Sequence, residues 1–230
     1  MADRPVVDEV SLKGSPMMKL FDHEGPLMDA LRKLTDLMFC NLAFCVFSLP
    51  MVTAGAALSA LYTCTQSIVE ETEDPIIVRQ FWKAFRANFL QATLLWLLSL
   101  AAAALLGAYY WAIGLMPPEM QKLYRVTYFL LVLVFLFGFQ YFFPLQARYR
   151  MKTRHLLKNA WLLSIAALPW TLCSLGVTAG TVYLTVFMNP GFLNMAVLLW
   201  AMLLFAIVAY LNSFFFRMAF RRLEPDQEAL

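Results

Sequence analysis

The chain has 230 residues, of which 61% are hydrophobic and 14% charged, and its formal net charge is +3. Soluble domains contain about 25% charged residues, and the mean hydropathy of +0.65 departs from them in the same direction. This composition excludes an ordinary soluble globular protein and predicts a multi-pass membrane protein. The small positive charge is typical of the cytoplasmic edges of such proteins, so we expect no nucleic-acid partner.

The N-terminal segment, residues 1–33, is polar and of mixed charge. A cleavable signal peptide would instead have a basic start, a short apolar core and a small-residue cleavage site. We therefore expect residues 1–33 to lie in the cytoplasm. The first apolar run is then expected to stay in the protein as an anchor.

Apolar regions make up most of the remaining chain, and each is long enough for a transmembrane helix, which needs about 20 residues. No polar segment between them is long enough to bury a core of its own. We therefore predict a single integral membrane domain over residues 1–230, folded as an all-α polytopic transmembrane helical bundle. The apolar regions are residues 37–69, 87–116, 126–147, 159–188 and 192–216.

The first apolar region, residues 37–69, is interrupted near its middle by Pro50 and Gly55. At about 1.5 Å per residue it reaches on the order of 50 Å, which exceeds the roughly 30 Å core of a bilayer. We interpret the interruption as a turn between two short helices, in which the Ser48 and Thr53 hydroxyls satisfy backbone groups freed by the proline. A kink in one long helix and a re-entrant hairpin are the alternatives.

The distribution of Lys and Arg predicts the orientation, because these residues are retained on the cytoplasmic side. The segment 148–158 contains five basic residues and no acid, and the tail, residues 217–230, contains three Arg, so we place both inside. With two crossings in 37–69, only Lys122 and Arg125 lie outside. We therefore predict about six membrane helices with both termini in the cytoplasm.

The predicted spans contain no ionisable side chain in their interiors. Because membrane enzymes and ion-coupled carriers need such groups at depth, we expect neither activity. The four Cys show no metal-ligand spacing and the two His lie far apart, so we expect no metal or cofactor. Neutral polar side chains at depth are expected to hydrogen-bond between helices. The alternative is a solute path lined by Asn41, Gln66, Gln140 and Asn212.

The sequence GVTAG, residues 176–180, has the GxxxG spacing that lets two helix backbones approach closely. It predicts a helix contact without indicating the partner. The candidate helix-turn and packing residues are Asn41, Pro50, Thr53, Gly55, Gly176 and Gly180.

Two predicted cytoplasmic segments, residues 79–90 and 148–161, combine aromatic and basic residues at helical spacing. This pattern is typical of amphipathic helices lying in the membrane interface. One interpretation is anchoring on anionic lipid, and the other is docking of a cytoplasmic or membrane partner. The candidate docking residues are Phe81, Trp82, Phe85, Arg86, Asn88, Phe89, Arg154, Lys158 and Asn159.

The chain from about residue 20 to residue 171 resembles the YesL-like family of bacterial membrane proteins, a domain of unknown function. The shared pattern is an early Asn, then Leu-Pro, Thr-x-Gly and Ala-Leu-Tyr, followed by Phe-x-x-x-Phe-x-x-Asn-Phe-x-Gln-Ala-Thr. In this chain these elements fall on Asn41, Leu49-Pro50, Thr53, Gly55, residues 60–62 and residues 81–93.

The resemblance implies a multi-pass protein of the cell membrane of Gram-positive bacteria. It also implies an accessory role in oligosaccharide import, because members of the family are encoded beside carbohydrate-uptake ABC transporters. The chain lacks the Glu and Gly of the loop by which importer permeases grip their ATPase, and only Ala160 and Leu168-Pro169 match it. We therefore expect a non-enzymatic accessory protein, with membrane lipids and ABC importer subunits as partners. A homo-oligomer is also compatible with the sequence.

Overall fold

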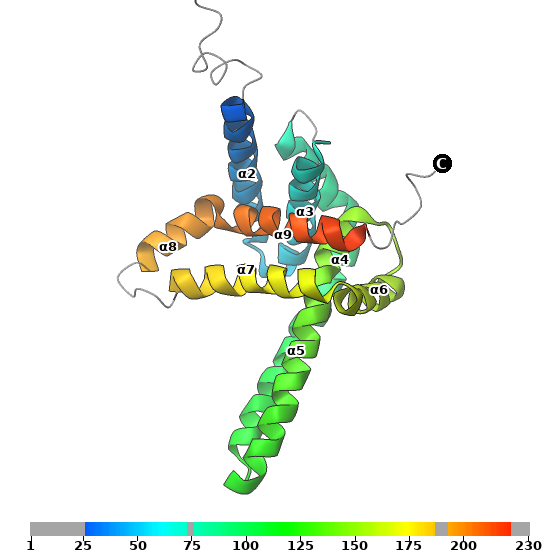
Figure 1. Ribbon diagram of the computed structural model, residues 1–230, viewed down its shortest axis with the longest axis vertical. Coiled ribbons are helices and arrows are strands. Elements are labelled where there is room, and N and C mark those ends of the chain that lie inside the picture. The colour runs from blue at the N-terminus through cyan, green and yellow to red at the C-terminus, as the bar shows by residue number, and fades with distance from the viewer. Residues whose placement is uncertain (1–25, 73–75, 187–192, 222–230) are drawn as a thin grey trace, which may run out of the picture.

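The computed structural model describes residues 26–72, 76–186 and 193–221, and every regular element in these ranges is a helix (Figure 1). The short η2 is a 3-10 helix and η4 is a π-helix. The elements are α2 (Pro26–Ser48), η2 (Met51–Thr53), α3 (Ala54–Glu70), α4 (Ile77–Gly114), α5 (Pro118–Arg148), α6 (Thr153–Ala166), α7 (Leu168–Val186), α8 (Leu193–Leu199), η4 (Trp200–Leu204) and α9 (Phe205–Phe220).

Helices α2 and α3 form an antiparallel hairpin (Figure 1). The Lys33 ammonium donates a hydrogen bond to Glu71 Oε1 at 3.1 Å, which joins the start of α2 to the end of α3. Hydrogen bonds to Asp29 and then to Glu71 raise the pKa of Lys33 above its usual value. Residues 49–53 therefore form a turn between two helices and not a kink within one.

Pro50 has no N–H to donate, so it interrupts the helical hydrogen-bond pattern. Hydrogen bonds from Thr53 hold the turn in its place. The Thr53 amide donates to Pro50 O at 2.8 Å, and the Thr53 hydroxyl lies 2.6 Å from Phe47 O and 2.8 Å from Pro50 O. Thr53 thus has the predicted role. The Ser48 hydroxyl is buried without a hydrogen-bond partner among the described residues, so the role predicted for it was wrong.

Helix α3 lies at the centre of the molecule and packs against α2, α4, α5 and α9. Small residues on its first turns, including Ala56, Ala57 and Ala60, are fully buried. A Cβ at Gly55 would lie only 2.4 Å from Trp96 Cβ and 2.7 Å from Ala92 O of α4. The close approach of α3 and α4 therefore requires glycine at this position.

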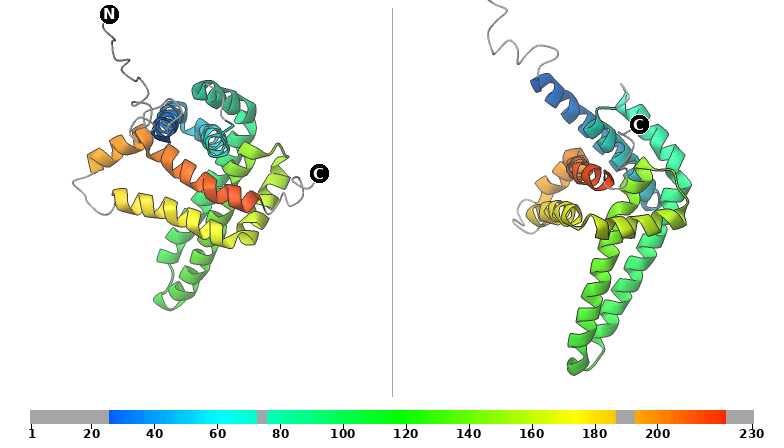
Figure 2. Two further views of the ribbon diagram at one scale, coloured as in Figure 1. Left: turned by 45° about the horizontal axis from the view of Figure 1, so that its top comes forward. Right: turned by 45° about the vertical axis from the view of Figure 1, so that its right-hand side comes forward.

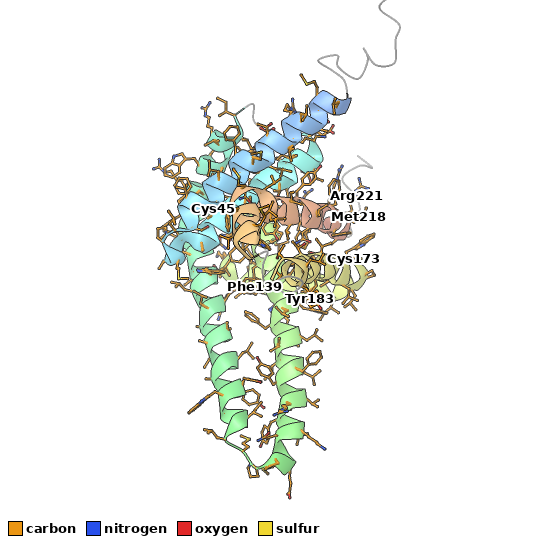
Figure 3. All side chains as sticks on the ribbon, turned by 90° about the vertical axis from the view of Figure 1, so that its left-hand side faces the viewer. Cys45, Phe139, Cys173, Tyr183, Met218 and Arg221 are labelled. Atoms are coloured by element: carbon orange, nitrogen blue, oxygen red, sulfur yellow. The ribbon has the colours of Figure 1, made fainter. Side chains whose placement is uncertain are left out.

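Helices α4 and α5 are the longest elements, with 38 and 31 residues, and their far halves project together beyond the rest of the molecule (Figures 1 and 2). We call this projection the arm. Figure 3 shows the side chains of its two helices as sticks, projecting to the sides of the arm and into the space between the helices. Large apolar residues such as Leu105, Trp111, Val126 and Phe129 are exposed there, as expected of a surface that faces lipid.

The predicted span over residues 159–188 is not one straight helix, which corrects the sequence interpretation. Helix α6 ends at Ala166 and α7 begins at Leu168, with a bend of 97° between them. Pro169 is the second residue of α7, where its missing N–H costs no helical bond but would have broken a continuous helix.

Three described helices are long and apolar enough to cross a membrane, or four if the bent pair α6–α7 counts as one span. The three are residues 77–114, 118–148 and 197–220. Helices α7 and α9 lie side by side and across α5 (Figures 1 and 2). Membrane helices are thus supported, whereas six spans and cytoplasmic termini stay predictions. The end segments 1–25 and 222–230 lie outside the described residues.

One predicted interfacial helix is corrected and the other is found as a separate element. Helix α4 runs without a break from Ile77 to Gly114, so residues 79–90 are its first part and do not form a helix of their own. Helix α6, in contrast, is a separate helix of 14 residues that covers most of the second segment.

Candidate functional site

A polar groove lies between α3, the first half of α4 and residues 149–152, which connect α5 to α6. We call it the α4–α5 groove. Its outer part, beside Lys152, has a volume of about 510 Å³, and its inner part, around Gln146, about 210 Å³. A third part of about 400 Å³ adjoins the inner one beside Glu70. The polar residues lining it are Thr63, Gln66, Ser67, Glu70, Thr72, Gln80, Lys83, Asn88, Gln91, Gln146, Arg148, Tyr149, Arg150 and Lys152.

The side chain of Gln91 holds the connecting segment against α4. Gln91 Nε2 donates to Met151 O at 2.8 Å, and Asn159 Nδ2 of α6 lies 3.6 Å from Met151 Sδ. The Tyr149 amide bonds back to Leu145 O at 2.9 Å and closes the end of α5. These contacts fix the position of the groove wall that carries Arg150.

The end of the groove next to Glu70 is closed by an ion pair. Arg148 pairs with Glu70, and its guanidinium lies 5.8 Å from the Tyr149 ring centre and 5.6 Å from that of Phe220. Arg217 of α9 donates to Val69 O at 3.1 Å, which satisfies a carbonyl at the C-terminal end of α3. The C-terminal ends of α3, α5 and α9 therefore meet at this point.

The groove carries excess positive charge. Glu70 is the carboxylate among its lining residues, and Arg148 already neutralises it. Lys83, Arg150 and Lys152 have no ion-pair partner within the described part of the chain. A concave surface lined by one sign of charge concentrates ions of the opposite sign.

Gln146 lies at the floor of the groove with only 3% of its surface exposed. Neither Nε2 nor Oε1 of this amide has a hydrogen-bond partner among the described residues. An unpartnered buried polar group costs about 1–3 kcal/mol, so such groups call for a specific explanation. Sequence reasoning missed Gln146, although a polar residue within the apolar region 126–147 was a visible signal.

Two of the predicted docking residues are core residues, which corrects the sequence interpretation. Phe81 and Phe85 are buried, and their rings lie 5.8 and 4.9 Å from that of Phe47 in α2. Phe89 is half-buried and packs 5.4 Å from Phe85. These rings hold α4 against the α2–α3 hairpin, and Phe81 and Phe85 present almost no surface to a partner.

The remaining docking candidates are accessible. Trp82 is 44% exposed, and the Arg86 guanidinium lies 5.8 Å from its ring centre. Arg154 and Lys158 are exposed on α6, and Asn159 is half-buried beneath them. The structure describes all nine docking candidates. Of these, Asn88 alone lines the α4–α5 groove.

Asn41 is fully buried and joins α2 to the irregular start of α9. Its Nδ2 donates to Trp200 O at 3.0 Å and to Ala201 O at 2.7 Å, and its Oδ1 accepts from the Ala206 amide at 2.9 Å. These backbone groups belong to the π-helix η4 and the turn after it. Asn41 therefore has the predicted packing role, with three bonds to a single segment.

The other polar residues predicted at depth also bond between helices. Gln66 Nε2 donates to Pro144 O at 3.0 Å, and Asn212 Nδ2 donates to Thr178 Oγ1 at 3.0 Å. Gln140 Nε2 donates to Ser174 Oγ. Their nitrogen donors are thus used in packing, which favours the packing interpretation over the solute path.

The close helix contact predicted at Gly176 and Gly180 is absent from the described part of the chain. A Cβ added at either position would meet no atom within 4 Å. Helix α7 instead contacts α9 through side chains on another face, such as Thr178 with Asn212. The described residues also contain no group of three or more His, Cys, Asp or Glu that could hold a metal ion.

The sequence of the chain is similar to known proteins of one family. Residues 37–110 match the family described as "Protein of unknown function, DUF624", which is the YesL-like family, so the predicted resemblance is confirmed. The chain is also 27% identical over 179 residues to the uncharacterized protein YteU of Bacillus subtilis (strain 168), covering 74% of this chain and 78% of that protein. No solved structure matches the chain.

Proposed function

We propose that this chain, whose residues 37–110 match the DUF624 or YesL-like family of unknown function, is a non-enzymatic accessory protein that docks on other membrane proteins. We place it in the bacterial cell membrane as a multi-pass protein of about six helices, with both termini in the cytoplasm. We propose the subunits of a carbohydrate ABC importer as its partners.

The observation that carries this proposal is the exposure of an aromatic and basic pair on α4, Trp82 and Arg86, and of two basic residues on α6, Arg154 and Lys158. Tryptophan and arginine are the residues that contribute most to protein–protein interfaces. The Arg86 guanidinium lies 5.8 Å from the Trp82 ring centre, so the two side chains are in cation–π contact.

A stand-alone path for a neutral solute has less support. The amide nitrogens of Asn41, Gln66, Gln140 and Asn212 are used in bonds between helices. These bonds would have to break before the same groups could bind a passing solute. A membrane enzyme is less supported still, since the predicted spans lack ionisable side chains.

Photo-crosslinking in the native membrane tests the proposal. The chain is tagged at its C-terminus, and Trp82 is replaced by the photoreactive amino acid p-benzoylphenylalanine. We expect an importer permease to be cross-linked and identified by mass spectrometry. Trp111 is the matched control, because it is a tryptophan on the same helix, 70% exposed, at the far end of the arm.

Cross-linking of the same protein from positions 82 and 111, or of no protein from either, would overturn docking at this surface. A second test is independent of the photoreactive group. The double substitution Arg86→Glu with Lys158→Glu should abolish recovery of the importer subunit, whereas Lys122→Glu with Arg125→Glu should leave it unchanged.

A further inference from the structure

The floor of the α4–α5 groove presents a hydrogen-bond donor and an acceptor side by side. Gln146 Nε2 and Oε1 belong to one buried amide, and neither atom has a hydrogen-bond partner among the residues that the structure describes. A hydroxyl group can accept from the first and donate to the second, so a polyol matches this amide better than a simple ion does. The half-buried amide of Asn88 lines the same part of the groove.

Within the described part of the chain, the cations at the rim of the groove have no carboxylate partner. Lys83 and Arg150 line the inner part together with Gln146, and Lys152 lines the outer part with Arg150. Guanidinium and ammonium groups bind phosphate oxygens through charge-assisted hydrogen bonds. The ligand chemistry is therefore a phosphate that carries hydroxyl groups.

An apolar surface continues from the rim toward the arm. A hollow of about 410 Å³ is lined by Leu90 and Leu94 of α4 together with Gln91, Met151, Lys152 and Thr153, and it shares Gln91, Met151 and Lys152 with the groove. Leu90 is 82% exposed. A soluble phosphate ester has no apolar part that would bury this surface, whereas the acyl chains of a lipid would cover it.

We propose that the α4–α5 groove is a binding site for an anionic glycerophospholipid with a polyol headgroup, of which phosphatidylglycerol is the simplest. Lys83 and Arg150 bind the phosphate, and the Gln146 amide binds the headgroup hydroxyls together with Asn88 Oδ1, since Asn88 Nδ2 donates to Ser59 Oγ at 3.4 Å. The acyl chains run over Leu90 and Leu94. This inference goes beyond the proposed function, and it requires no protein partner.

The test uses the full-length protein purified in an uncharged detergent, with lipid occupancy measured by native mass spectrometry. Phosphatidylglycerol is titrated against phosphatidylcholine, and we expect it to bind preferentially, with one molecule retained. Soluble sn-glycerol 1-phosphate is the second arm, and we expect it to bind at most weakly. Equal retention of the two lipids, or equal binding of the soluble ester, would overturn the assignment.

Two substitutions locate the site. Arg150→Gln should weaken phosphatidylglycerol binding about tenfold, as expected for the loss of one charge-assisted hydrogen bond. Arg154→Gln removes the same charge four residues away, outside the groove, and should have a much smaller effect. Equal losses from both would mean that lipid binding is general surface electrostatics, which would overturn the site.

A third substitution, Gln146→Met, tests the floor of the groove without changing charge. Because the Gln146 amide makes no hydrogen bond to the described residues, the melting temperature without added lipid should not fall. The stabilisation produced by phosphatidylglycerol should be lost. Unchanged lipid stabilisation in this variant would remove Gln146 from the site and overturn the proposal. Since no importer subunit is present in these measurements, their outcome is separate from that of the docking test.

Discussion

Asn41 illustrates how a single amide can stabilise an irregular helix. A π-helix breaks the regular pattern of backbone bonds and leaves groups that need other partners. The side chain of Asn41 has two N–H donors and one carbonyl oxygen, and it bonds to Trp200 O, Ala201 O and Ala206 N. Within a bilayer no water would replace these bonds.

We therefore expect Asn41→Leu to destabilise the protein by about 1–3 kcal/mol. The substitution keeps the number and branching of the side-chain heavy atoms but leaves three backbone groups of the η4 region without the bonds that Asn41 makes. Thermal unfolding in detergent measures the effect. Cys45→Ala is the control, because it removes two long thiol contacts from the same helix, 3.5 Å to Ala201 O and 3.8 Å to Asn41 Nδ2, and keeps the Asn41 amide. An equal loss in both variants would show that the amide bonds have no special weight.

Two glycines, Gly55 and Gly176, lie in contrasting surroundings, the first closely packed and the second open. Gly55→Ala would place a Cβ 2.4 Å from Trp96 Cβ, and we expect overpacking to cost about 1–3 kcal/mol. Gly176→Ala meets no atom within 4 Å and should be neutral, or stabilising by up to about 1 kcal/mol, through its higher helix propensity. Comparing the melting temperatures of the two variants checks the prediction, and a loss at position 176 would contradict it.

Among the helices, the α2–α3 hairpin makes a prediction that distinguishes a turn from a kink. Lys33→Cys combined with Glu71→Cys, in a background without other cysteines, should be joined rapidly by a short bismaleimide cross-linker. In one continuous helix these positions, 38 residues apart, would be about 57 Å apart and could not be joined. The pair Lys33→Cys with Lys122→Cys is the control, because Lys122 lies at the far end of the arm.

The sequence predicted the break at Pro50 but not the one at Pro169, although both follow a leucine. Residues 37–69 are too long for one membrane span, and this excess length indicated a turn. Residues 159–188 fit one span by length, so the sequence offered no conflict. The bend between α6 and α7 depends on how α6 packs on α5, where Trp161 lies against Gly138. That contact joins positions far apart in the chain.

The candidate site was also predicted only in part, because its geometry depends on contacts between positions far apart in the chain. Helical spacing of Phe81, Phe85 and Trp82 predicts an amphipathic segment, but it does not reveal which side another helix covers. The α2–α3 hairpin folds over Phe81 and Phe85, so only Trp82 remains accessible. Gln146 was missed because an unpartnered amide is recognised only when its surroundings are known.

The arm bears on the orientation of the whole molecule. With 38 residues, α4 is about 57 Å long, well beyond the roughly 30 Å core of a bilayer. The predicted topology places Lys122 outside the cell and the cationic groove inside. The turn of the α2–α3 hairpin is predicted to be outside unless the hairpin is re-entrant.

Labelling of single cysteines in intact cells tests this arrangement. In a cysteine-free background, an impermeant maleimide should label Gln121→Cys and leave Lys158→Cys unlabelled until the cells are opened. Met51→Cys decides the remaining alternative, because labelling from outside supports two full crossings and protection supports a re-entrant hairpin. Labelling of Lys158→Cys from outside would reverse the predicted orientation.

The bonds of Asn41 also impose an order on biosynthesis. Its partners lie 159 to 165 positions later in the chain. At about 5–20 residues per second, a ribosome needs on the order of ten seconds or more to make them. During that interval the first helix is already synthesised, while its buried amide still has nothing to bind. The nascent chain must therefore shelter this group with water, with the insertion machinery or with a neighbouring protein until α9 arrives.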